Sequence, residues 1–157
     1  MNNTQFKNED GTLIPCISES QMREVDRIAV EDFRLGILQM MENAGRNLAQ
    51  FVIDILGKNT VRVITIAVGS GGNGGGGICC ARHLYNHGYR VEILLTKAQE
   101  KLKGATAIQM RIIQNTGIKI HSPKAIEEIF SSSDIIISKK VQYIASLAKC
   151  AYKDVLG

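Results

Sequence analysis

The sequence predicts an α/β protein with a mostly parallel sheet and helices on the faces of that sheet. Strand-like apolar runs alternate with helix-like segments from about residue 61 to residue 138, as in strands joined by crossover helices. Seven of the fifteen glycines fall between Gly69 and Gly77, where a strand-like run meets a helix-like one. The 157 residues are 45% apolar, which is enough for one domain with a packed core.

Composition and charge argue against several classes of protein. The net charge of +4 comes from scattered Lys and Arg, so we expect no nucleic-acid binding. We also expect no membrane association, because no apolar run is long enough to span a bilayer and the N-terminus lacks a signal-peptide core. The four cysteines form no CxxC pair, which favours reduced thiols in a cytoplasmic protein.

The N-terminal part is expected to hold a tail and then a helix. Residues 1–10 are mostly polar, residues 1–14 are predicted to be a flexible tail, and residues 15–157 are assigned to a single domain. A first helix is predicted from Ser18 to about Phe33. Ser18 together with Gln21 fits the capping box that begins many helices.

A second helix is predicted from about Ile37 to Leu56, where apolar residues recur at helical spacing. Gly57 follows as its C-terminal stop. Gly45 inside this helix costs about 1 kcal/mol relative to Ala. This cost indicates that another element packs very close to Gly45.

The rest of the chain is predicted to alternate between strands and helices. The expected strands are Val61 to Val68, Arg90 to Thr96, Ile118 to Ile120 and Asp134 to Ser138. The expected helices are about Gly77 to Asn86, Lys103 to Asn115 and Pro123 to Phe130, with a last one from about Val141 to Leu156. Right-handed crossovers then give a doubly wound sheet of about four strands. The last helix would cover a sheet edge or form a dimer contact.

The glycine run permits three interpretations. Gly69 to Gly74 matches G-x-G-x-x-G, the dinucleotide-binding pattern, in the required place between strand and helix. The ribose-binding acid of that pattern is absent from the end of the next strand, where Thr96 and Lys97 stand, although Lys97 could suit a 2′-phosphate. A P-loop is excluded because no Lys followed by Ser or Thr closes the run. The third interpretation is a tight turn without a ligand.

Four motifs in a fixed order carry a resemblance to a known family. They are Met40-Met41-Glu42-Asn43-Ala44-Gly45, the run from Gly69 to Gly77, Ala81-Arg82-His83-Leu84, and Gly88-Tyr89. Together they resemble the NAD(P)H-hydrate epimerase family, or YjeF N-terminal domain, over about residues 16 to 138. The resemblance implies a Rossmann-like three-layer α/β/α sandwich with N-terminal helices, often as a homodimer. It also implies an isomerase of metabolite repair, which interconverts the R and S epimers of hydrated NADH or NADPH with a bound potassium ion.

The resemblance further implies a substrate-binding site. The family loop reads G-x-G-N-N-G-G-D-G, and its substrate-contacting part corresponds to Gly72, Asn73, Gly74, Gly75 and Gly76. Asn73 and Ser138 are the implied metal ligands, and Ser138 stands where the family has an Asp. Gly76 replaces the Asp of the family loop, and Gly72 replaces an Asn.

The family domain continues beyond Ser138 into a segment with a further Asp, which residues 139–157 do not match. We therefore expect a C-terminally truncated member of the family. Epimerisation needs a positioned acid or base, and carboxylates are the natural groups for it. Because those carboxylates are replaced or missing, no catalytic residue is assigned and impaired activity is expected.

Three functional hypotheses stay open. The chain is an epimerase acting on a small molecule, a nucleotide-binding module without turnover, or an interaction module of the same fold. On the second helix, Glu42 and Asn43 could face the ligand cleft, or Asn43 could bind the backbone of the glycine loop. His83 is expected to pack or to orient a turn rather than to act as a base.

Overall fold

The computed structural model describes residues 6–7, 10–14, 17–58, 62–138 and 141–146. The chain divides into two units, Met1–Gly36 and Ile37–Gly157. In the first unit, β1 (Phe6–Lys7) pairs antiparallel with β2 (Leu13–Ile14), within the segment predicted to be a tail, and α1 (Glu19–Glu31) follows. The assignment of residues 15–157 to one domain stays a prediction.

Helix α1 begins as the capping box predicts. The backbone N–H of Gln21 donates to the hydroxyl of Ser18 at 3.2 Å, and the N–H of Ser18 donates to the Gln21 side chain at 2.7 Å. Farther along the helix, Arg27 bridges Glu24 at 2.7 Å and Glu31 at 2.5 Å. These contacts are exposed and stabilise the helix locally.

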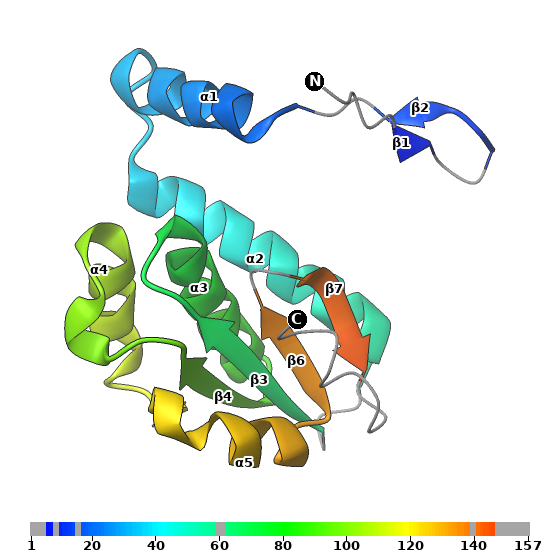
Figure 1. Cartoon of the computed structure of the whole chain (residues 1–157), viewed down its shortest axis with the longest axis vertical. Helices are drawn as coiled ribbons and strands as arrows, with labels where there is room; N and C mark the ends of the chain where they lie inside the picture. Colours follow the sequence, from blue (N-terminus) through cyan, green and yellow to red (C-terminus); the bar gives the residue numbers. More distant parts are fainter. Residues whose placement is uncertain (1–5, 8–9, 15–16, 59–61, 139–140, 147–157) are drawn as a thin grey trace. The chain divides into compact units, whose positions relative to one another are not determined.

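The second unit is built on a five-stranded sheet (Figure 1). Its strands are β3 (Val63–Val68), β4 (Arg90–Leu95), β5 (Lys119–His121), β6 (Ile135–Ser138) and β7 (Val141–Ser146). Its helices are α2 (Ile37–Leu56), α3 (Gly72–Asn86), α4 (Gly104–Ile113) and α5 (Ile126–Ser132), with short 3-10 turns η1 (Gln99–Lys101) and η2 (Pro123–Ala125). The strand order is β5-β4-β3-β6-β7, and the first four strands are mutually parallel.

This strand order fixes which face each helix covers. The chain moves outward from β3 to β4 to β5 and then returns across the sheet to β6. Right-handed crossovers therefore place α3 and α4 on one face and α5 on the other (Figure 1). The direction of winding reverses between β3 and β6, so the carboxyl ends of these two strands flank the switch point where such sheets bind ligands.

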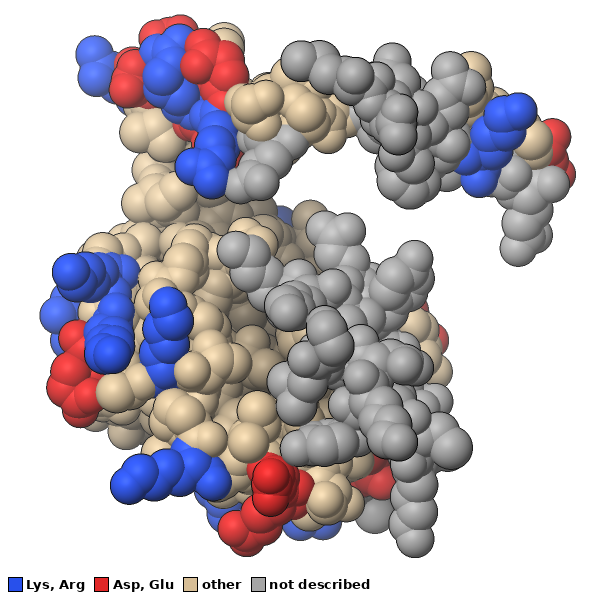
Figure 2. Space-filling view, in the orientation of Figure 1, with Lys and Arg blue, Asp and Glu red and all other residues tan. Residues whose placement is uncertain are grey.

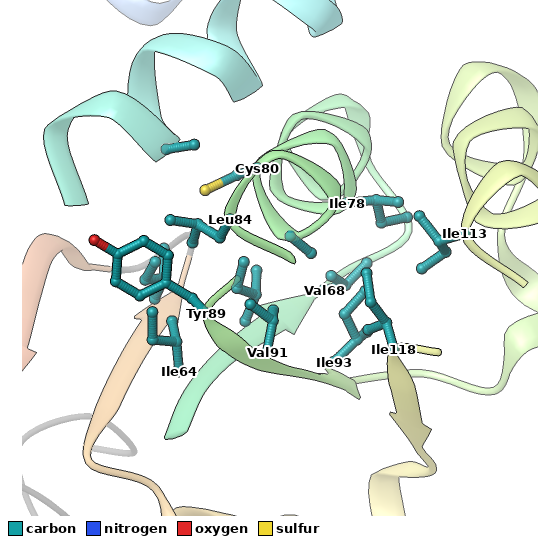
Figure 3. Close-up of a cluster of buried hydrophobic side chains, with 14 of the residues drawn as sticks. Ile64, Val68, Ile78, Cys80, Leu84, Tyr89, Val91, Ile93, Ile113 and Ile118 are labelled. Atoms are coloured by element: carbon teal, nitrogen blue, oxygen red, sulfur yellow. The ribbon is translucent and has the colours of Figure 1, made fainter. Parts of the chain in front are cut away.

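The core lies between the sheet and α3, and α2 packs on the outer side of α3 (Figure 3). Buried aliphatic residues dominate it, including Ile64, Ile93, Leu84 and Val52, each with no exposed surface. Figure 3 shows Cys80 on the side of α3 that faces α2, whereas Ile78 lies toward Ile113 of α4. Helix α3 is thus held on three sides.

The predicted helix from Val141 to Leu156 is wrong over residues 141–146, which form β7. This strand pairs antiparallel with β6, with Ser138 opposite Val141 and Ile135 opposite Ser146. The free backbone groups along the edge of β6 favour an added strand, and pairing outweighs helical periodicity in so short a segment. Residues 147–157 lie outside the described part of the chain.

Candidate functional site

The glycine run is mostly helix rather than loop. Gly69 to Gly71 link β3 to α3, and the helix begins at Gly72 with Gly71 as its N-cap residue. The prediction that this helix begins at about Gly77 is therefore wrong. Glycines are poor helix formers, but close packing around this segment overrides that preference. The first turn of α3 thus presents backbone N–H groups at the carboxyl edge of the sheet.

Close contacts explain two of these helical glycines. A β-carbon at Gly74 would overlap the carbonyl oxygen of Gly69. A β-carbon at Gly75 would lie 2.6 Å from the sulfur of Met41 and 3.2 Å from Oγ1 of Thr106. Only glycine at these two positions lets the start of α3 pack against both the turn before it and its neighbouring helices.

Gly72 and Gly76 are different, because both have room for a side chain. A β-carbon at Gly76 would meet no atom within 4 Å, and one at Gly72 would meet only Met41, at an ordinary 3.9 Å. Packing therefore does not require glycine at either position. These are the two positions where the resemblance expects Asn and Asp, and a β-carbon fits at both.

Helix α2 lies against the same segment through Gly45. A β-carbon there would overlap the Cβ of Cys79 and lie 2.8 Å from the carbonyl oxygen of Gly76 and 2.9 Å from the nitrogen of Cys80. This is the close approach that the mid-helix glycine predicts. The contact fixes α2 against the second turn of α3.

Asn73 and Ser138 lie at the same edge of the sheet. Asn73 is an exposed residue of the first turn of α3, and Ser138 is the half-buried last residue of β6. Ile137 pairs with Ile66 of β3, so Ser138 lies beside the end of the strand that leads into the glycine run. Among the described residues, no hydrogen bond engages the side chain of Asn73 or of Ser138.

Two threonines support the junction, and neither role was predicted from the sequence. The Thr106 hydroxyl, 2% exposed on α4, donates to the carbonyl oxygen of Gly71 at 3.1 Å. The hydroxyl of Thr96, just after β4, donates to the carbonyl oxygen of Val68 at 3.2 Å. A lone Thr at a helix start or strand end carries no signal for such a contact, because its partner is distant in sequence.

Glu42 on α2 forms an ion cluster with α3 instead of facing a cleft as a free acid. Its carboxylate accepts hydrogen bonds from Arg82 at 2.5 and 2.7 Å and lies 2.7 Å from Nε2 of His83. Arg82 is the main cause that lowers the pKa of Glu42. His83 thus helps to pack the two helices, as expected. Asn43 accepts a hydrogen bond from Arg46 at 3.1 Å rather than binding the loop backbone.

Cys79 and Cys80 lie buried on α3 as free thiols. Burial raises the pKa of Cys79 to about 11 and that of Cys80 to about 12. Neither thiol is ionised near neutral pH, so neither is a nucleophile in this fold. They act as small packing residues between α2, α3 and the sheet.

The geometry defines a class of protein: a doubly wound α/β domain whose ligand edge carries a glycine-rich strand-to-helix junction. Within this class, the profile of the family described as YjeF-related protein N-terminus matches residues 37–138. The match covers more than half of the chain, and the chain belongs to this family. This confirms the family predicted from the motifs.

Named relatives agree with this family. The chain is 38% identical over 141 residues to the NAD(P)H-hydrate epimerase of Dehalogenimonas lykanthroporepellens, a match that covers 88% of the chain and 56% of that protein. It is 37% identical over 107 residues to the NAD(P)H-hydrate epimerase of Rhodopirellula baltica, with 68% and 43% covered. The chain thus spans about half the length of these relatives.

A solved structure supports the fold. The crystal structure of yeast YNL200c superposes with a TM-score of 0.70 at 20% identity, covering 90% of this chain and 63% of that one. The predicted α/β fold with a mostly parallel sheet is confirmed. None of the described helices is long and apolar enough to cross a membrane.

Proposed function

We propose that this protein binds hydrated NADH and NADPH at the glycine junction and interconverts their R and S epimers slowly. The observation that carries this proposal is the N-terminus of α3, formed by Gly72 to Gly76 at the carboxyl edge of a parallel sheet, in a chain of this family. Backbone N–H groups at such a helix start suit a pyrophosphate. Asn73 would add a side-chain amide to that cradle.

The slow rate follows from the groups at this edge. Glu42 is held by Arg82, and Gly76 has no side chain, so neither position supplies a free carboxylate. A general acid or base contributes about 10²–10⁴-fold to a rate. The residues present can bind and orient the substrate, and they can stabilise developing charge through backbone amides. Proton transfer would then depend on water.

A potassium ion would suit the donor atoms available. Among the described residues, no group of three or more His, Cys, Asp or Glu side chains could hold a metal ion. The amide oxygen of Asn73 and the hydroxyl of Ser138 are neutral donors, and neutral oxygens bind potassium in proteins. These two residues would hold the ion. When bound, the ion would supply a positive charge beside the phosphates of the substrate.

Chromatographic separation of the epimers tests this proposal. We expect the purified protein to exceed the spontaneous interconversion rate, and Asn73→Ala to lower this excess at least fivefold through a lost charge-assisted contact, of order 1 kcal/mol. Asn86→Ala, at the far end of α3, should leave the rate unchanged. A wild-type rate equal to the spontaneous rate, with potassium present, would contradict the proposal.

Restoring a carboxylate provides a second test. Gly76→Asp places an acid where a β-carbon meets nothing within 4 Å. We expect it to raise the rate about 10- to 100-fold, below the full range for acid–base catalysis because the geometry is not optimised. If the variant folds and its rate stays at the wild-type value, Gly76 does not face the reacting group.

Nucleotide binding without turnover is the second candidate function, favoured by the lack of a side chain at Gly76. Calorimetry with NADP separates it from the first: binding with no interconversion supports it, and the absence of heat contradicts both.

We further propose a cytoplasmic protein that forms a homodimer. The free thiols of Cys79 and Cys80 and the exposed apolar side chains of Phe51 and Ile55 on α2 support this, and sedimentation analysis tests the dimer.

A further inference from the structure

A hollow of about 450 Å³ lies at the carboxyl ends of β4 and β5, beside the glycine junction. This volume is within the range of about 300–1,000 Å³ that is usual for small-molecule sites. Its walls come from two separate segments: Leu95 and residues 98–100, at and after the end of β4, and residues 120–124, at and after the end of β5. The site proposed above uses neither segment.

The hollow and the glycine junction lie at the ends of neighbouring strands of the sheet. Val68 and Leu95 pair at the ends of β3 and β4, and the N–H of Thr96 donates to the carbonyl oxygen of Val68 at 2.9 Å. Neighbouring strands are about 4.8 Å apart. A ligand whose phosphates rest on the start of α3 therefore reaches the hollow one to two strand spacings away, which is the reach of a ribose and its base.

The lining suits a purine nucleoside. Leu95, Ile120 and Pro123 give apolar surfaces for a flat ring. The ring of His121 is fixed beside them, because its Nε2 lies 2.9 Å from the carboxylate of Glu92. Apolar walls with a few fixed polar groups are usual for small-molecule sites.

Charged groups stand at the rim of this hollow. Lys124 and Glu100 both line it, and exposed lysines at 97, 101 and 103 belong to the same chain segment as Glu100. Figure 2 shows Lys and Arg side chains gathered on the side of the second unit that carries α4 and the turn before α5. The excess of positive charge favours a ligand that carries an additional phosphate.

We infer that this hollow binds the adenosine half of the dinucleotide and favours the 2′-phosphorylated form, so that hydrated NADPH is preferred to hydrated NADH. Lys124, which lines the hollow, supplies the charge that attracts the 2′-phosphate. Glu100 is the nearby carboxylate that would oppose it. This inference rests on the proposed function and names the subsite that sets its substrate preference.

Fragment binding tests the subsite directly. We expect calorimetry on the full chain to show that adenosine 2′,5′-bisphosphate binds about tenfold more tightly than AMP, as one charge-assisted phosphate contact would give. Glu100→Gln should increase the affinity for the bisphosphate, because a repulsive charge is removed. If AMP binds as tightly as the bisphosphate, the phosphate preference is wrong.

Variants at the rim locate the binding. Ala98→Trp would fill the hollow from an exposed position, and Lys124→Gln would remove one lining charge; each should weaken bisphosphate binding about tenfold or more. Lys101→Gln is the matched control, because this lysine does not line the hollow, and its effect should stay within twofold. If Ala98→Trp and Lys124→Gln both retain wild-type affinity with unchanged circular dichroism spectra, the hollow is not the adenosine subsite.

The two proposals fail in different ways. If the wild-type protein interconverts the epimers while Ala98→Trp leaves the KM for hydrated NADPH unchanged, only the subsite inference is overturned. If the bisphosphate binds and Ala98→Trp abolishes that binding, but neither the wild type nor Gly76→Asp exceeds the spontaneous rate, only the proposed activity is overturned.

Discussion

Two glycines in adjoining helices have opposite steric surroundings, and they predict opposite effects of the same substitution. At Gly45 a methyl group would lie within 3 Å of backbone atoms of Gly76 and Cys80. We expect Gly45→Ala to lower the free energy of unfolding by about 1–2 kcal/mol, because overpacking outweighs the gain in helix propensity. Urea denaturation would measure this change.

Gly76→Ala is the matched comparison, since it also adds one methyl group inside a helix. Its methyl group would meet nothing within 4 Å. We expect it to raise the free energy of unfolding by up to about 1 kcal/mol through helix propensity alone. Equal effects at the two positions would show that the contact between α2 and α3 is looser than described.

The ion cluster at Glu42 predicts a dependence of stability on pH. Because Arg82 lowers the pKa of Glu42 in the folded state, the contribution of the cluster is complete above the ordinary value of 4.5 and is lost as the pH falls below it. The Glu42 side chain is 41% exposed, so Glu42→Gln should cost only about 0.5–1 kcal/mol at neutral pH. Thermal unfolding between pH 7 and pH 3 should show the difference disappear.

An exposed acid on α5 provides the control for this measurement. Glu128 forms no ion pair within the described part of the chain. Glu128→Gln should therefore change stability by less than about 0.5 kcal/mol. A deficit for Glu42→Gln that persists unchanged to pH 3 would exclude an electrostatic origin.

At the scale of elements, the sequence predicted helices most accurately where capping residues and apolar periodicity agree. The bounds of α2 match the prediction, and α1 begins at the predicted capping box. The start of α3 was misplaced, because five glycines in helical conformation contradict their propensity, and the close contacts of this segment with Gly69, Met41 and Thr106 appear only in the folded chain. The strand β7 was also missed, because its conformation depends on the edge of β6.

The hydrogen bond from α4 to the glycine junction predicts an effect on binding. Thr106→Val keeps the shape of a buried side chain but removes its bond to the carbonyl oxygen of Gly71. We expect a loss of about 1 kcal/mol in stability. We also expect weaker binding of NADP, because Gly71 is the N-cap residue of α3. Calorimetry and urea denaturation of the same sample would separate these effects.

Thr116→Val serves as the control at the other end of α4. The Thr116 hydroxyl donates to the carbonyl oxygen of Ile113 at 2.6 Å, at the C-terminal end of α4 and away from the glycine junction. Its loss should lower stability by a similar amount and leave NADP affinity unchanged. If both variants weaken binding equally, the effect of Thr106 is one of general stability.

For the whole molecule, the order of strands and helices was largely predictable, since alternating apolar runs dictate a doubly wound sheet. The site was predictable only where one local motif carries it, as at Asn73. The hollow beside β4 and β5 was not, because Leu95 and His121 come from distant segments and meet only in the folded sheet. The strand end itself carries no acid, whereas Glu100 lines the hollow from the following turn.

The shared core predicts that the second unit unfolds cooperatively. Ile93 in the middle of β4 has no exposed surface, so Ile93→Ala should lower the free energy of unfolding by about 2–5 kcal/mol. Ile112→Ala, at a side chain that is 46% exposed, should cost less than about 0.5 kcal/mol. Denaturation midpoints measure both, and a similar loss for the two variants would contradict the packing described.

The buried Cys79 allows the separation of α2 from α3 to be measured by chemical labelling. With a pKa of about 11, roughly one Cys79 in ten thousand is a thiolate at pH 7, and its sulfur is shielded where α2 crosses α3. An alkylating reagent therefore modifies it only during the moments when these two helices part. The rate of that labelling, measured by peptide mass spectrometry, reports how often α2 and α3 separate.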